Sequence, residues 1–152
     1  MINKNQKAIL SDAIKFRPYV KHTDQAFVFS TWLRNYKHSS YFAKGIRSSI
    51  FFPGHQKLLE LLFDKPTLKV FIAHPTDDDQ TILGYLVAEF HHKAPVIHFI
   101  FIKEAFRNMG IATLLLNHAE INPDNFHFTH WTMPMDEIIR KHPNIRYNPY
   151  CL

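Results

Sequence analysis

Residues 96–116 read VIHFIFIKEAFRNMGIATLLL, and this stretch predicts the fold more strongly than any other part of the chain. Residues 96–102 form an apolar run typical of a buried strand, and Gly110 opens a segment with the apolar periodicity of a helix. The first N–H groups of a helix have no partner within it, and the helix dipole places partial positive charge there. Because Gly110 has no Cβ and Ala112 is small, a ligand can approach this backbone closely. The stretch therefore predicts an anion site suited to a diphosphate.

The rest of the chain predicts a single α/β domain over residues 1–152. Strands are expected at residues 13–20, 68–73, 81–90, 96–103, 126–133 and 145–150, and helices at residues 23–39, 55–63, 110–119 and 134–141. The expected order is β-α-α-β-β-β-α-β-α-β. Pro18 favours an edge position for the first strand, and Pro53-Gly54 predicts a break before the second helix. Gly84 inside a strand predicts a bulge or a close backbone contact.

Composition limits the class of protein. The 152 residues include one Cys and carry a formal net charge of +5 with His neutral. One cysteine excludes a secreted disulfide scaffold, so a reducing, cytoplasmic compartment is expected. No apolar run approaches the ~20 residues of a membrane span, so no membrane is expected among the partners. The basic excess attracts anions, nucleic acid included, but is equally consistent with ordinary solubility.

Arg107, Gly110 and Ala112 form the pattern Arg-x-x-Gly-x-Ala. It resembles the cofactor-binding motif of the GCN5-related N-acetyltransferases (GNAT), which carry Gln/Arg-x-x-Gly-x-Gly/Ala after the fourth strand. The expected element order is also that of this family. The resemblance implies the acyl-CoA N-acyltransferase fold, with a mixed, mostly antiparallel sheet of about six or seven strands flanked by helices. It also implies acetyl-CoA as the cofactor. An ordinary strand–loop–helix connection is the alternative interpretation of the motif.

The resemblance further implies how this segment would hold coenzyme A. Strand residues would expose backbone groups to the pantetheine arm where the fourth and fifth strands splay apart. Loop and helix amides would bind the pyrophosphate, Thr113 would add a hydroxyl, and Arg107 would add charge. The cofactor-binding residues expected on this basis are Ile100, Phe101, Ile102, Arg107, Asn108, Met109, Gly110, Ile111, Ala112 and Thr113.

Acyl transfer to an amine needs a base, and His98 is the leading candidate. It lies nine residues before Arg107, where some family members carry a catalytic Glu. The ordinary pKa of His, ~6.5, suits a base at neutral pH. Glu89, late on the preceding strand, is a second candidate that would act through water. The alternative role for His98 is structural, with its ring satisfied by a backbone carbonyl in the sheet.

Many members use a Tyr on the helix after the fifth strand as the acid for the departing thiolate, and this chain departs from that pattern. Residues 135–142 contain no Tyr, and Asn144-Ile145 replaces the usual Gly-Phe. Tyr147 or Tyr150 from the last strand is the expected substitute. The departure also permits a member that binds without transferring.

The sequence therefore predicts an acetyl-CoA-dependent N-acetyltransferase in which a primary amine, on a small molecule or a peptide, attacks the thioester directly. The segment between the first two helices either lines the acceptor cleft or closes the core, through Tyr41, Phe42, Arg47, Phe51 and Phe52. Two alternatives stay open. One is a catalytically inactive GNAT-fold binding or structural protein, related to phages, since residues 32–46 resemble phage-encoded acetyltransferase-like proteins. The other, less favoured, is a nucleic-acid-associated modification protein. The pair His91-His92 and the histidines near residue 130 supply no set of three ligands, so no metal is expected.

Overall fold

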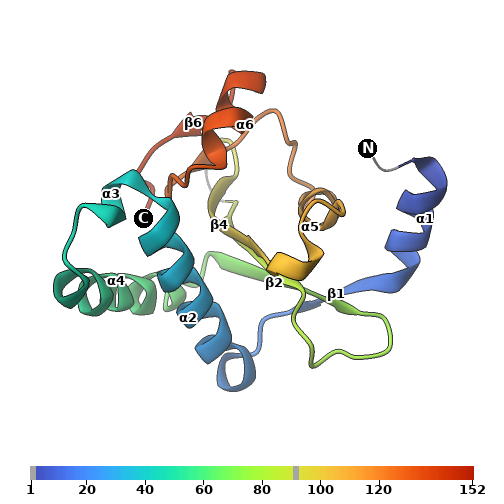
Figure 1. Cartoon of the computed structure of the whole chain (residues 1–152), viewed down its shortest axis with the longest axis horizontal. Helices are drawn as coiled ribbons and strands as arrows, with labels where there is room; N and C mark the ends of the chain where they lie inside the picture. Colours follow the sequence, from blue (N-terminus) through green and yellow to red (C-terminus); the bar gives the residue numbers. More distant parts are fainter. Residues whose placement is uncertain (1–2, 91–92) are drawn as a thin grey trace.

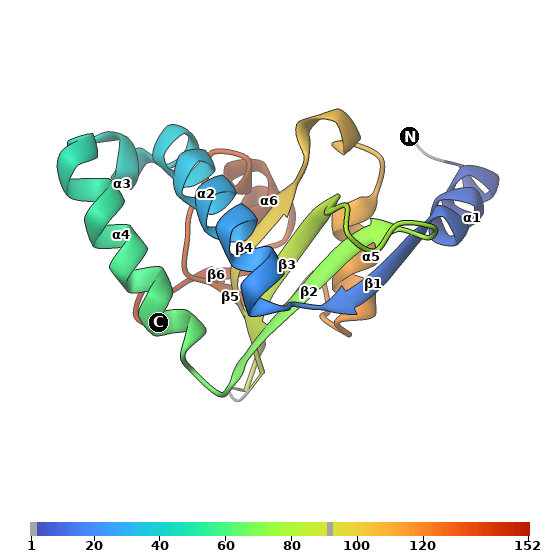
Figure 2. The same cartoon turned by 90° about the horizontal axis from the view of Figure 1, so that it is seen from below.

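A computed structural model describes residues 3–90 and 93–152 as a sheet with helices on both faces (Figures 1 and 2). In these residues the strands are β1 (Ile14–Pro18), β2 (Leu68–Pro75), β3 (Gly84–Glu89), β4 (Val96–Ile102), β5 (His127–Phe128) and β6 (Arg146–Tyr147). The helices are α1 (Lys4–Ala13), α2 (Lys21–Ser39), α3 (Tyr41–Lys44), α4 (Ser48–Phe63), α5 (Ile111–His118) and α6 (Met135–Lys141), and Glu104–Phe106 forms a 3-10 turn, η1.

The six strands follow one another across the sheet in chain order, β1 to β6. Neighbours from β1 to β4 are antiparallel, whereas β5 is parallel to β4 and β6 is parallel to β5. The expected mixed, mostly antiparallel sheet is therefore confirmed. Pro18 ends the edge strand β1, where its missing N–H breaks no ladder inside the sheet.

Two apolar cores lie on the two faces of the sheet (Figures 1 and 2). Helices α2, α3 and α4 cover one face, where Trp32 is fully buried and stacks on Phe99 with ring centroids 4.8 Å apart. The four-residue spacing of Val28, Trp32 and Tyr36 places all three in this core, as the sequence predicts. Helix α5 covers the other face through its buried Ile111.

Two helix boundaries differ from the expectation. Pro53 was expected to precede the second helix, yet α4 begins at Ser48 and runs through it. The missing N–H of Pro53 removes only one hydrogen bond near the helix start, and burial of Phe51 holds this turn against the core. Helix α2 begins at Lys21 rather than at Thr23 or Asp24, and α1 was not expected at all.

The two last strands are much shorter than expected. Only His127–Phe128 and Arg146–Tyr147 pair, rather than residues 126–133 and 145–150. After Thr129 N–H donates to Ile97 O at 3.2 Å, the chain turns away from β4. Among the described residues, the part of β4 beyond Ile97 therefore has no strand partner on the β5 side, and the two strands splay.

The predicted close approach at Gly84 is confirmed. A Cβ built on this residue would lie 2.5 Å from the carbonyl oxygen of Phe101 on β4. A side chain at this position of β3 would therefore clash with the backbone of β4, and only glycine fits without a shift.

Candidate active site

His98 is the extra residue of a β-bulge in β4. Val87 of β3 pairs with Phe99. The next residue of β3, Ala88, pairs with Ile97, so His98 stands opposite no residue of β3. Bulges re-aim a side chain that regular pairing would direct elsewhere. The leading candidate base thus occupies the one irregular position of the β3–β4 ladder.

The two candidate bases lie in direct contact. His98 Nε2 and Glu89 Oε1 are 2.8 Å apart, and both side chains are sealed from solvent. Glu89 also accepts from Lys65 Nζ at 2.9 Å and from Thr67 Oγ1 at 2.5 Å. Burial raises the pKa of Glu89, but the hydrogen bonds from Thr67, Lys65 and His98 outweigh it and lower the pKa to about 2. Glu89 is therefore ionised at neutral pH and accepts the Nε2 proton of His98 directly.

The other ring nitrogen of His98 leads away from Glu89 into a second group of polar side chains. His98 Nδ1 lies 2.9 Å from Thr129 Oγ1, which lies 2.9 Å from His130 Nδ1. His130 Nε2 lies 2.8 Å from His55 Nε2 on α4. Side chains rather than backbone carbonyls thus meet both ring nitrogens of His98. Sequence reasoning missed His55 entirely and treated Thr129 and His130 only as strand residues.

The two outer histidines are held neutral. Burial lowers the pKa of His130 well below its ordinary value, and the nearby rings of His55 and His98 lower it further. Burial lowers the pKa of His55 to about 4. Their rings are packed among aromatic side chains, with His55 stacked on Phe51 at 5.1 Å and His130 edge-on to Trp32 at 5.0 Å.

A cavity of about 280 Å³ lies where β4 and β5 splay, against the first turn of α5. Its walls carry members of the buried polar group and the end of the predicted cofactor motif, through His98, Ile100, Ala112, Thr113, Phe128 and His130. An elongated ligand lying along the free side of β4 would thus pass from the helix N-terminus to His98.

The predicted pyrophosphate loop has the backbone geometry of an anion site. Gly110 has φ 89° and ends the loop as the N-cap of α5, with no side chain capping the first helix amides. Asn108 is also left-handed, with φ 64°. Arg107 Nε donates to Ile102 O at 3.0 Å, which fastens the exposed loop to the end of β4. These residues fit an acyl-CoA because the first helix amides have no competing side-chain acceptor and open toward the splay.

A second cavity, of about 510 Å³, lies between α4, the end of β6 and the residues that follow it. Its wall is mostly aromatic and aliphatic, and His130 lines both cavities. Tyr147 lies here rather than beside His98, and burial together with Tyr150 raises its pKa. Of the aromatic side chains expected either to line an acceptor cleft or to close the core, Phe42 and Phe51 line this cavity, whereas Tyr41 donates to Asp136 at 3.2 Å.

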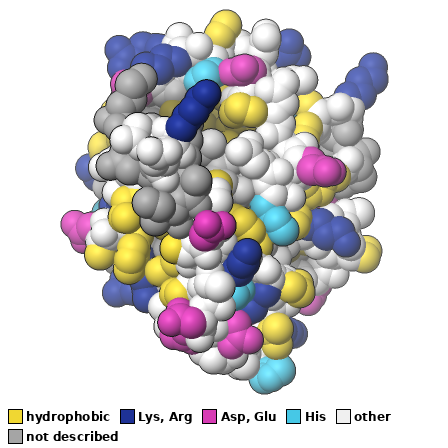
Figure 3. Space-filling view, turned by 90° about the vertical axis from the view of Figure 1, so that its right-hand side faces the viewer, with side chains coloured by type: hydrophobic (Ala, Val, Ile, Leu, Met, Phe, Trp, Pro, Cys, Tyr) yellow, Lys and Arg dark blue, Asp and Glu magenta, His cyan; other side chains and the backbone are white. Residues whose placement is uncertain are grey.

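Three further expectations concern a metal site, a membrane span and the distribution of surface charge. Within residues 3–90 and 93–152, no cluster of three or more His, Cys, Asp or Glu side chains could hold a metal ion. The pair His91-His92 lies outside the described residues. None of the helices described has the length and apolar character needed to span a membrane. On the face that carries α1, basic and acidic side chains are interspersed (Figure 3).

Residues 18–128 match the acetyltransferase (GNAT) family. The chain belongs to this family. The GNAT assignment makes it an N-acetyltransferase by class, with acetyl-CoA as the cofactor. No curated protein sequence matches it significantly.

Solved structures share the GNAT fold with this chain at low sequence identity. The protein YycN from Bacillus subtilis, assigned as an acetyltransferase, has a TM-score of 0.57 at 12% identity, over 89% of this chain and 80% of its own. An N-acetyltransferase, PaiA, from Thermoplasma acidophilum, solved in complex with coenzyme A, has a TM-score of 0.50 at 17% identity, over 71% and 70%. A protein from Pyrococcus furiosus, also assigned as an acetyl transferase, has a TM-score of 0.50 at 18% identity, over 70% and 72%.

Proposed function

We propose that this GNAT protein acetylates a primary amine by direct attack on the thioester of acetyl-CoA, without a covalent enzyme intermediate. The observation that carries the proposal is the cavity at the β4–β5 splay, which joins the α5 N-terminus to the buried pair of His98 and Glu89. Bound acetyl-CoA would supply the activated carbonyl. Backbone amides at Gly110–Thr113 would hold its pyrophosphate, with Arg107 adding charge at the surface.

The protein's own residues supply the proton acceptor. An amine must be neutral to attack, and His98 has the only ring in the polar group that contacts a carboxylate among the described residues. Glu89, ionised by its donors, stabilises the imidazolium that forms when His98 gains a proton. Tyr147 is the proposed acid for the departing sulfur, since the helix α6 carries no Tyr. Its place in the aromatic cavity supports a role on the acceptor side.

The test is calorimetric titration of the whole protein with acetyl-CoA, beside Gly110→Asp and Gly110→Asn. Both substitutions add a side chain of the same size at a left-handed position that Asn and Asp tolerate, and they differ only in charge. We expect micromolar binding by the wild type and at least tenfold weaker binding by Gly110→Asp than by Gly110→Asn. No binding by the wild type would refute the proposed function. Binding without transfer to any amine would identify an inactive member.

A further inference from the structure

Five side chains, from α4, β3, β4 and the segment that follows β5, form one unbroken line of hydrogen bonds through the protein. The line runs from the aromatic cavity, through the interior, to the ionised carboxylate of Glu89, and none of its four links exceeds 2.9 Å. Its members, in order, are His55, His130, Thr129, His98 and Glu89. A buried polar group needs a hydrogen-bond partner, and in this line each member supplies one to the next.

The direction of every hydrogen bond in this line follows from its end. Ionised Glu89 can only accept, so the singly protonated form of His98, which the relay requires at rest, carries its proton on Nε2 and accepts at Nδ1. Thr129 then donates its one hydroxyl proton to His98 and accepts from Nδ1–H of His130. Neutral His130 is left with an acceptor Nε2, which takes the Nε2–H of His55. All four donors thus point toward Glu89.

The free end of the line opens into the cavity of about 510 Å³. Among its described lining residues there is no Asp, Glu, Lys or Arg, and the wall is formed chiefly by Tyr36, Ile50, Phe51, Leu58, Tyr147 and Tyr150. No side chain that lines it can act as counter-ion to an ammonium group. An amine with an apolar or aromatic body is favoured here, and its proton must leave as the nitrogen attacks.

We infer that this line is a proton relay, through which an apolar primary amine bound in the aromatic cavity passes its proton from His55 to His98. The inference deepens the proposed acyl transfer and rests on it. His55 is the group that meets the amine, and His98 is the store of the proton beside Glu89. Thr129 and His130 carry the proton between them.

In the proposed relay, each bond or proton that is gained at one atom is lost at another. The amine forms its N–C bond while the C–S bond of the thioester breaks, and the sulfur keeps that electron pair and takes a proton from Tyr147, which regains one from solvent. The proton of the amine adds to His55 Nδ1, and the Nε2 proton of His55 moves to His130 Nε2. The Nδ1 proton of His130 moves to Thr129, whose own proton moves to His98 Nδ1. The charge then rests on His98 beside ionised Glu89.

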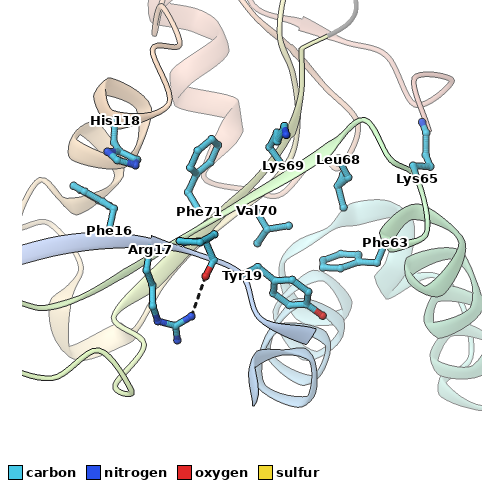
Figure 4. Close-up of a pocket in the computed structure, with 11 residues that line it drawn as sticks. Phe16, Arg17, Tyr19, Phe63, Lys65, Leu68, Lys69, Val70, Phe71 and His118 are labelled. Atoms are coloured by element: carbon cyan, nitrogen blue, oxygen red, sulfur yellow. Dashed lines mark hydrogen bonds between the residues drawn. The ribbon is translucent and has the colours of Figure 1, made fainter. Parts of the chain in front are cut away.

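The pKa values favour this end point. Burial lowers the pKa of both His55 and His130, so neither ring retains the charge. Lys65 binds the same carboxylate oxygen of Glu89 and is 33% exposed, so it marks the solvent side of this end of the line. Lys65 lies at the rim of an open cleft of about 510 Å³ on the β1–β2 side, with its ammonium turned away from the rings of Tyr19 and Phe63 (Figure 4).

The direction of the hydrogen bonds in the line can be tested without the cofactor and without an activity assay. In ¹⁵N-histidine NMR spectra of the whole protein near pH 7.5, we expect His55 and His98 as the Nε2–H tautomer and His130 as the Nδ1–H tautomer. If the hydrogen bonds did not all point toward Glu89, at least one of these histidines would show a different tautomer. Any other assignment for His130 or His98 would overturn the relay, whatever the outcome for acetyl-CoA binding.

The proton flow is tested with a matched pair at the centre of the line. With acetyl-CoA and 2-phenylethylamine, Thr129→Val should lower kcat by about 100-fold, the scale of general base catalysis, with acetyl-CoA affinity unchanged. Thr129→Ser keeps the hydroxyl and should stay within about threefold of wild type. Should Thr129→Val fail to fold, His55→Gln at the half-buried cavity end carries the same expectation. Full kcat in the first variant that folds would overturn the relay alone.

Two further measurements test the class of amine and the dependence of the relay on the proposed function. We expect kcat/KM for 2-phenylethylamine to exceed that for spermidine, a polycation, by at least tenfold. Equal or better use of spermidine would overturn the apolar class. Absence of transfer to every amine, with acetyl-CoA bound, would overturn the proposed function and the relay together.

Discussion

The neutral state of His55 predicts a loss of stability in mild acid. Burial lowers its pKa from 6.5 to about 4. Because the folded-state pKa lies below the unfolded one, the stability linked to this ring is fully present above pH 6.5 and is lost as the pH falls toward 4. One pKa unit corresponds to about 1.4 kcal/mol, so by pH 4.5 the loss reaches about 2.5 kcal/mol. Partial exposure of the ring reduces this to about 2 kcal/mol.

Burial of His130 acts in the same direction, whereas Glu89 acts later. The pKa of Glu89 is about 2 in the folded protein against 4.5 ordinarily, so its contribution is lost only between these pH values. The assay is urea unfolding at pH 7.5, 6.5, 5.5 and 4.5, followed by far-UV circular dichroism. His55→Gln, which keeps a donor for His130 but does not titrate, should flatten the profile by about 2 kcal/mol. A wild-type free energy of unfolding that is constant over this range, or an equal slope in the variant, would refute the reasoning.

Two further predictions concern stability. Gly84→Ala should destabilise the protein by about 1–3 kcal/mol, because its Cβ would lie 2.5 Å from Phe101 O. Gly54→Ala should stabilise it by about 0.5–1 kcal/mol, because Gly54 lies in helix α4 and its Cβ would meet nothing within 4 Å. Equal midpoints of urea unfolding for the two variants would contradict this prediction. Asp24→Asn should destabilise by about 2–3 kcal/mol at pH 7, because the buried carboxylate accepts from both terminal nitrogens of Arg17 at 2.7 and 2.9 Å. Thermal unfolding at pH 7 measures it, and an unchanged Tm would show that the pair is dispensable.

Much of the fold could be predicted because local and long-range signals agree. The apolar run before Gly110 forms a central strand, and the four-residue spacing in α2 forms a buried stripe. Gly84 marks a real backbone contact. The splay of the fourth and fifth strands, implied by the family resemblance, follows from the early turn of the chain after Phe128.

The rest depended on contacts between distant residues. Pro53-Gly54 is a strong local break signal, yet burial of the surrounding face keeps it helical. The assumption of regular alternation does not predict a bulge, so nothing in the sequence of β4 marked His98 as the extra residue of one. His55 stands 75 positions from its partner His130, and no spacing rule relates them. Sequence reasoning therefore found the two members at one end of the polar line, His98 and Glu89, but not the end that reaches the aromatic cavity.

The bulge at His98 also bears on how the protein tolerates change in length. Deleting one residue from a strand ordinarily turns every later side chain to the opposite face. Here β4 already has one residue more than β3 needs: without His98, Ile97 and Phe99 would become neighbours and still face Ala88 and Val87. The position proposed to carry the chemistry is thus the one that the sheet can omit, so its two cores could persist in a chain that has lost the activity.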